Sequence, residues 1–246
     1  MKCSRWIVRT CLVTVPVCWS LSTPALGADL SSLQVLSQAE FRKLAQDLGA
    51  IASFKGLASA TPLGVTGFDV ATSLSWSSLE NREVWNKAAA GLGAPSGVPV
   101  PALRLAKGLP LGLDAGLMLS TVPATGAQLA GAELRWAVVE GGPLTPALGL
   151  RAHATRLSGV NQLSLGTTGV DVTLSKGFAL VTPYVGSGAL RTAATAQVSS
   201  HLAGENISAS RMFAGAHVNF GLFDATLEWD RSAGLRTVSG RLGYRF

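Results

Sequence analysis

Few residues of this chain have the types and spacing that catalysis or metal binding requires. The three histidines, His153, His201 and His217, stand far apart, and none is paired at a spacing typical of metal ligands. His217 is followed two residues later by Asn219, so a histidine and a serine nucleophile do not alternate on this segment. All three cysteines lie within the first 18 residues. The sequence therefore predicts no catalytic residue, no metal site and no cofactor.

Charged residues at alternating positions of apolar segments point to a different kind of chemistry. Buried charges must pair, so a near-balanced set on one face of adjacent strands predicts a network of salt bridges. We interpret it as the filling of a narrow barrel, and the alternative is the lining of an ion-selective pore. The expected members are the acids Asp69, Asp114, Glu133, Asp171, Asp224, Glu228 and Asp230 and the bases Arg104, Arg135, Arg151, Arg241 and Arg245.

The first 27 residues have the pattern of a cleaved secretory signal peptide. Lys2, Arg5 and Arg9 precede an apolar stretch, and Ala25-Leu26-Gly27 is a small-x-small cleavage site. The apolar stretch is too short to span a bilayer as a helix. The net charge of +6 includes these three bases, so removal of the leader lowers it to +3. The high isoelectric point is therefore weak support for nucleic-acid binding, and we expect no nucleic-acid partner.

One amphipathic helix is predicted after the leader, near residues 37–54. Ser37 and Glu40 form a capping box, and Leu36 with Phe41 could form the hydrophobic staple that accompanies it. Apolar residues then recur at helical spacing as far as Ile51. A single amphipathic helix cannot bury its own apolar stripe. We therefore assign residues 28–63 to an N-terminal segment that either plugs a lumen or lies at its periplasmic mouth.

From residue 64 to residue 246 the apolar period changes from 3.6 to 2. In the last segment, for example, Val238, Leu242, Tyr244 and Phe246 share one face. Strict alternation predicts strands with one apolar and one polar face. Glycine- and proline-containing turns separate segments of about ten residues, which is the signature of a transmembrane barrel. The expected strands are 64–77, 101–108, 112–122, 127–140, 145–157, 163–176, 180–194, 212–222, 223–230 and 237–246.

Alternation alone also fits a soluble β-sandwich, but other features favour a membrane barrel. The strands are near the length that crosses hydrocarbon at a tilt, whereas strands of soluble proteins are usually shorter. Aromatic residues such as Trp76 and Trp229 stand at strand ends, as in interfacial girdles. We predict an all-β fold, a transmembrane antiparallel up-and-down barrel of about ten strands (8–12), with one short N-terminal helix.

An even strand count places both termini on the periplasmic side of a bacterial outer membrane. The turns near 107–111, 140–145, 176–179 and 222–224 are then periplasmic and short, as such barrels require. The two longest predicted connections, near 77–101 and 193–210, face outward. The expected location is the outer membrane of a Gram-negative bacterium.

The last three residues resemble the C-terminal insertion signal of outer-membrane barrel proteins. Tyr244 and Phe246 are the matching positions. The resemblance implies that the barrel-assembly machinery and periplasmic chaperones are partners during biogenesis, with outer-membrane lipid as the final surroundings.

The chain is also similar to an uncharacterised family of proteobacterial outer-membrane barrel proteins. The similarity spans about residues 40–246 and implies fold and location, with no activity attached. It rests on five segments: Phe41-Arg42-x-Leu44-x-x-Asp47-Leu48-Gly49, Pro62 to Asp69, Lys107-Gly108-Leu109-Pro110, Ser175-Lys176-Gly177-Phe178 and Thr182 to Gly186.

Three function hypotheses remain open at this point. The first is a non-catalytic barrel with a structural, binding or surface-interaction role. The second is a narrow, porin-like pore for small solutes. The third is a membrane-embedded hydrolase, which we do not favour because no nucleophile and base stand together in the sequence.

Overall fold

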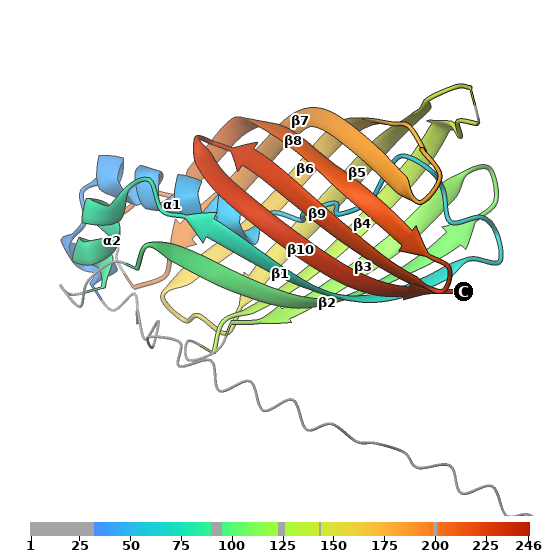
Figure 1. Cartoon of the computed structure of the whole chain (residues 1–246). Coiled ribbons are helices and arrows are strands. Elements are labelled where there is room, and N and C mark those ends of the chain that lie inside the picture. Colours follow the sequence, from blue (N-terminus) through green and yellow to red (C-terminus); the bar gives the residue numbers. More distant parts are fainter. Residues whose placement is uncertain (1–31, 90–94, 123–125, 143, 199–200) are drawn as a thin grey trace, which may run out of the picture.

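The computed structural model describes residues 32–246, apart from residues 90–94, 123–125, 143 and 199–200. These residues form a closed barrel of ten antiparallel strands in which each strand pairs with its neighbours in sequence and β1 pairs with β10 (Figure 1). The predicted signal peptide, residues 1–27, lies outside the described residues. The strands are β1 (Phe68–Ser78), β2 (Gly97–Leu109), β3 (Leu113–Thr121), β4 (Gln128–Val139), β5 (Ala147–Ser158), β6 (Leu163–Ser175), β7 (Val181–Ala196), β8 (Glu205–Phe220), β9 (Phe223–Ser232) and β10 (Leu235–Arg245).

The predicted all-β barrel of about ten strands is confirmed. The ten strands begin and end within a few residues of the predicted bounds, with three clear exceptions. The predicted outer connection 193–210 is wrong, because β7 continues to Ala196 and β8 already begins at Glu205. The prediction also began the first strand at residue 64 and the second at residue 101, whereas β1 begins at Phe68 and β2 begins at Gly97.

The two faces of each strand differ as a membrane barrel requires. In β1, Val70, Leu74 and Trp76 point outward and remain exposed, whereas Ala71 and Ser73 are buried against the interior. The same alternation recurs around the barrel, so a band of exposed leucine, valine and aromatic side chains covers the outside. Closure leaves no open sheet edge, which a strand in hydrocarbon could not tolerate. The soluble sandwich is therefore excluded.

The barrel has two distinct ends. We call the end that carries the connections after β1, β3, β5, β7 and β9 the odd-loop end. The other, which carries the turns after β2, β4, β6 and β8 and the C-terminal Phe246, is the even-turn end. Helix α1 (Gln38–Ala52) lies at the odd-loop end, far from the C-terminus (Figure 1).

The predicted helix and its capping box are both present. The backbone N–H of Glu40 donates to Ser37 Oγ at 3.3 Å, and Ser37 N–H donates to the Glu40 carboxylate at 2.9 Å. A one-turn 3₁₀ helix, η1 (Leu33–Val35), precedes α1. A second helix, α2 (Arg82–Ala88), occupies the connection after β1 and was not predicted. None of the described helices is long and apolar enough to cross a membrane.

A hydrophobic core fills the odd-loop end of the lumen. The apolar side of α1, including Phe41, Leu44 and Ile51, is buried there. The wall residues of this core point inward from the strand ends, where the alternation places apolar side chains inside instead of outside. They include Val98, Val100, Leu129, Leu163, Leu165, Ile207 and Leu235. This packing anchors the helix and closes one end of the barrel.

Candidate functional site: a plugged and charged lumen

The chain between α1 and β1 runs through the barrel. Residues 53–57 are buried, and the segment 53–63, which we call the plug, leads from the odd-loop end to the start of β1 at the even-turn end (Figure 1). The expectation that both ends of the chain lie on one side is therefore wrong for the N-terminal segment that the structure describes. The even number of strands correctly predicts that the start of β1 lies at the same end of the barrel as Phe246. The chain before β1, however, passes back through the lumen to the other end.

Helix α1 is fixed at the odd-loop end by polar contacts with three connections. Gln46 donates to the carbonyl oxygen of Ala233 at 2.8 Å, and Arg42 forms an ion pair with Glu205 at 2.7 Å. Asp47 accepts hydrogen bonds from Trp85 Nε1 at 3.0 Å and from the side chain of Asn81 at 2.9 Å. Burial raises the pKa of the Asp47 carboxyl, and these hydrogen bonds oppose that effect.

A second contact joins the two helices. Lys87 in α2 forms an ion pair with Glu40 in the first turn of α1. The hydrogen bond from Lys87 lowers the pKa of Glu40 to about 2, and the hydrogen bonds from Ser37 add to this effect. The odd-loop end is thus covered by a cap of two helices that hold each other. The sequence placed this helix either in the lumen or at its periplasmic mouth; the structure places it in the odd-loop mouth of the lumen, at the end opposite Phe246.

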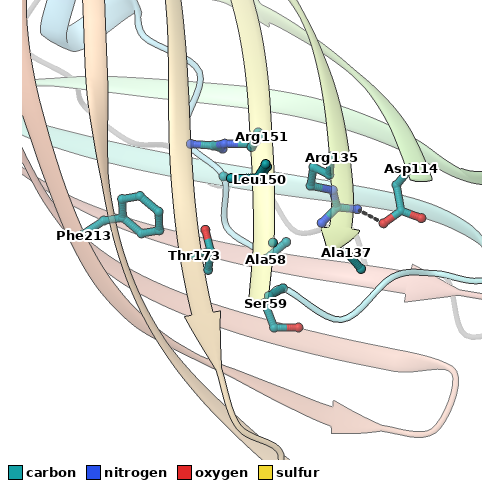
Figure 2. Close-up of a pocket in the computed structure, with 12 residues that line it drawn as sticks. Ala58, Ser59, Asp114, Arg135, Ala137, Leu150, Arg151, Thr173 and Phe213 are labelled. Carbon is teal, nitrogen blue, oxygen red and sulfur yellow. Dashed lines mark ion pairs between the residues drawn. The ribbon is translucent and has the colours of Figure 1, made fainter. Parts of the chain in front are cut away.

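The twelve charged residues expected to face the lumen all take part in ion pairs. Arg151 pairs with Asp171 and, at 3.5 Å, with Glu133; Arg135 pairs with Asp114 at 3.3 Å (Figure 2). The other members are joined as follows: Arg104 to Glu133 at 3.9 Å, Arg241 to Asp69 and Asp224, and Arg245 to Asp69 at 3.3 Å, with Glu228 and Asp230 paired to Arg211.

Two members of this network were missed in the sequence. Arg211, on β8, is 1% exposed and pairs with Glu228 at 3.4 Å, with Asp171 at 3.6 Å and with Asp230. Lys55, in the plug, pairs with Asp230 at 2.8 Å. Seven acids and five bases were predicted, which leaves two negative charges in excess. Arg211 and Lys55 restore the balance at seven of each among the described lumen residues.

The plug is bound to the wall by side chains that satisfy its backbone groups. Arg211 donates to the carbonyl oxygen of Phe54 at 2.8 Å, and Arg104 donates to that of Gly56 at 3.1 Å. The N–H of Leu57 donates to the Glu228 carboxylate at 3.1 Å. Buried backbone groups without partners cost free energy, so these contacts make an irregular segment stable inside the lumen.

Further contacts follow the plug toward the even-turn end. Ala60 N–H donates to Ser175 Oγ at 3.1 Å, and Leu63 N–H donates to the Asp114 carboxylate at 3.0 Å. Phe54 lies under the guanidinium of Arg104, with 4.6 Å between Arg104 Cζ and the ring centre. A Cβ on Gly56 would collide with the guanidinium of Arg151. The plug and the wall are therefore fitted closely to each other.

Little space remains between the plug and the wall. Two cavities beside the plug have volumes of about 20 Å³ each. One of them lies between Ala58, Ser59, Arg151 and Phe213 (Figure 2). A water molecule needs about 10–15 Å³ by this measure, so each cavity has room for about one water. Neither is large enough for a solute or a substrate.

The two histidines of the lumen lack the geometry of a nucleophile–histidine–carboxylate relay. His217 Nδ1 lies 3.0 Å from Thr226 Oγ1 and 3.9 Å from Asp224 Oδ1, so the hydroxyl and the carboxylate face the same ring nitrogen. A relay needs them on opposite nitrogens. His153 is buried 3.4 Å from Asp171, and neither of its ring nitrogens has a hydrogen-bond partner. No group of metal-ligating side chains was found among the described residues.

The C-terminal residues lie where the resemblance to an insertion signal requires exposed aromatic side chains. Tyr244 is 39% exposed and Phe246 is 60% exposed, both at the even-turn end. Their ring centres are 5.5 Å apart, and Phe223 and Phe68 extend the cluster on either side. These four rings form one aromatic patch on the outside of the barrel.

Comparison with known proteins gives distant likenesses only. No family model and no curated protein matches the chain. Among solved structures, the N-terminal β-barrel domain of Pseudomonas aeruginosa OprF is 12% identical, with coverage of 74% of this chain and 99% of that chain and a TM-score of 0.36. The β domain of the Bordetella autotransporter BrkA is 13% identical, covers the same shares and has a TM-score of 0.45. Neisserial surface protein A is 10% identical, with coverage of 73% and 96% and a TM-score of 0.32.

The strand pairing and the apolar exterior described above define the fold without these likenesses. This is the fold of the outer-membrane β-barrels. The similarity to an uncharacterised proteobacterial family remains a hypothesis, since no family model matches.

Proposed function

We propose that this chain is an outer-membrane β-barrel of a Gram-negative bacterium whose lumen is closed by its own N-terminal segment. Its role is non-catalytic: structural, binding or surface-interacting. The observation that carries this proposal is the plug, which occupies the lumen and leaves cavities of about 20 Å³ beside it. Neither of these two cavities has room for a solute beside the plug.

The orientation follows from the lengths of the connections. Barrels of this membrane have short periplasmic turns and longer extracellular loops. The even-turn end has the short turns, such as the one between Leu109 and Leu113, and the odd-loop end has the connection from Ser78 to Gly97 with α2. We therefore assign the odd-loop end to the cell surface. The cap formed by α1 and α2 is then the surface available to partners.

The same assignment of the two barrel ends to the two sides of the membrane bears on how the protein is inserted. The even-turn end, with its aromatic patch, is periplasmic. Tyr244 and Phe246 are then available to the barrel-assembly machinery, and periplasmic chaperones would deliver the unfolded chain.

A pore is the second candidate, favoured by the charged wall. Thirteen charged side chains of the strands, the twelve predicted ones and Arg211, line the lumen in the described part of the chain, and removal of the plug would leave them facing a water-filled channel. On this hypothesis the plug is a gate, and the closed conformation is the one described.

Planar-bilayer recording of the folded mature chain distinguishes these functions. We expect no stable single-channel steps from the wild-type protein and stable steps after deletion of residues 33–63. Stable steps from the wild type, lost in Glu133→Ala or Arg135→Ala, would establish the pore and overturn the closed barrel. For the hydrolase, an activity abolished in folded His217→Ala would overturn the non-catalytic role.

A further inference from the structure

The outward face of the barrel carries charges of one sign in the half nearest the odd-loop end. Four exposed arginines point away from the lumen there, and we call them the exterior arginines: Arg156, Arg191, Arg231 and Arg236. The acids in the described strands, by contrast, are all buried on the inward face. The charged side chains on the exterior of the described strands in this half are therefore all basic.

Two of these arginines stand directly opposite each other. Arg231 of β9 pairs in register with Arg236 of β10, next to the turn that joins the two strands. Directly opposite residues have their Cβ atoms about 4.5–5.5 Å apart, and like charges in such a pair destabilise the sheet. Their neighbours on the outer strands are Met212 and Ser78, so neither neighbour supplies a negative charge. In the described part of the chain, neither guanidinium has an ion pair.

The surface next to this pair is apolar and aromatic. One step toward the barrel middle, Trp229, Val238 and Trp76 form a row across three strands, each nearly half exposed. Tryptophan at this position marks the boundary between hydrocarbon and headgroups. The Arg231–Arg236 pair lies just beyond that boundary, at the level of the headgroups of the outward-facing leaflet.

We propose that Arg231 and Arg236 bind the phosphate of a lipid in the outward-facing leaflet. This inference rests on the proposed membrane location. A guanidinium donates two parallel hydrogen bonds to phosphate, and a phosphate between two guanidiniums removes their mutual repulsion. The lipid's acyl chains pack below against Trp229, Val238 and Trp76. The site selects lipids with an exposed phosphate over zwitterionic lipids whose phosphate is already paired with a choline.

The test measures lipid selectivity by tryptophan quenching. The mature chain, carrying Trp136→Phe, is folded into phosphatidylcholine vesicles that contain either brominated phosphatidic acid or brominated phosphatidylcholine. Trp76 and Trp229 are then the tryptophans that lipid can quench, because Trp85 is buried inside the cap. Their quenching reports which lipids lie beside the site. We expect a preference for phosphatidic acid that falls on the order of tenfold in Arg231→Gln/Arg236→Gln, since each basic residue contributes several-fold at a membrane surface.

A charge-matched variant provides the control. Lys107→Gln/Lys176→Gln removes the same charge at the even-turn end, and we expect it to keep the preference. An equal loss in both variants, or no loss in the arginine variant, would overturn the site. Competition by 10 mM inorganic phosphate would overturn the lipid as occupant. Quenching by brominated phosphatidylcholine in every variant tests membrane insertion, so failure of the location and failure of the site are distinguishable.

Discussion

Replacement of Lys55 by methionine tests whether the plug is held by the charge network. The side chain is 4% exposed, and its ammonium donates to Asp230 at 2.8 Å, to the carbonyl oxygen of Ala50 at 3.0 Å and to Ser53 at 3.1 Å. Methionine has a similar length and fills the same space without the charge. The substitution therefore removes three hydrogen bonds, one of which is the ion pair with Asp230, while it leaves the packing nearly unchanged.

The magnitude follows from what remains around Asp230. Removal of one partner from a buried ion pair costs about 3–5 kcal/mol when the other charge is left alone. Asp230 keeps Arg211 and the hydroxyl of Ser232, so the cost is smaller. We expect the docked plug to lose about 2–3 kcal/mol, which increases the undocked fraction roughly 30- to 150-fold.

Thiol labelling measures this fraction in the folded barrel. Ser59 is a half-buried residue of the plug and lies beside one of the cavities (Figure 2), so a cysteine at this position should react more slowly while the plug is docked than after the plug leaves the lumen. We expect Ser59→Cys to react with a charged methanethiosulfonate reagent much faster in the Lys55→Met background. Lys43→Met is the matched control, because Lys43 is an exposed residue of α1. Its labelling rate should equal that of the parent.

Two results would refute the reasoning. Heat-dependent migration on a gel verifies that both variant barrels are folded. Equal labelling rates in folded Lys55→Met and Lys43→Met would then mean that the ion pair does not hold the plug. Labelling of the parent as fast as that of the unfolded chain would mean that the plug is not docked at all.

Three further perturbations test the helix, the plug and the cap. Gly49→Val should destabilise the barrel by about 1–3 kcal/mol in thermal unfolding, because even a Cβ at this position collides with Thr192; no shift would mean that α1 does not seat there. Phe54→Ala removes a fully buried ring and should cost about 3–5 kcal/mol of plug docking, seen as faster Ser59→Cys labelling. The Glu40–Lys87 pair stabilises the cap above the usual carboxyl pKa and loses that effect as the pH falls from about 4.5 toward 2. Protease cleavage of the cap should therefore increase over this range in the wild type, and the increase should be smaller in Glu40→Gln, in which the Asp47 carboxyl of the cap still titrates.

The sequence located the strands well wherever apolar side chains point outward and polar side chains point inward. It failed at the odd-loop end of β7 and β8, because the pattern is inverted there. At the start of β8, Ile207 points inward to the core under α1, whereas Asn206 and Ser208 point outward. A search for apolar residues on the outside reads such a stretch as a loop. The inversion is a physical consequence of the helix in the mouth, which requires an apolar wall.

The path of the N-terminal segment could not be predicted from local patterns. The capping box at Ser37 and Glu40 fixes where α1 begins, and it contains no information on which mouth the helix occupies. That choice depends on tertiary contacts between distant residues, such as Asp47 with Trp85 and Gln46 with Ala233. The plug itself has no regular secondary structure, so periodicity gives it no signal.

The charge balance of the lumen contains information that single residues do not. Inward parity found seven acids but only five bases, and a closed lumen cannot retain two unpaired carboxylates without a large cost. The excess predicts two further cations in contact with the wall. Arg211 is the first, at an inward position of β8, which begins at Glu205, whereas the predicted strand began at residue 212, directly after Arg211. Lys55 is the second, and it cannot come from the wall, because the plug carries it. The plug therefore supplies part of the positive charge that balances the lumen acids. Its departure would leave Asp230 without Lys55 and Glu228 without the N–H of Leu57, and water or cations would have to solvate these carboxylates.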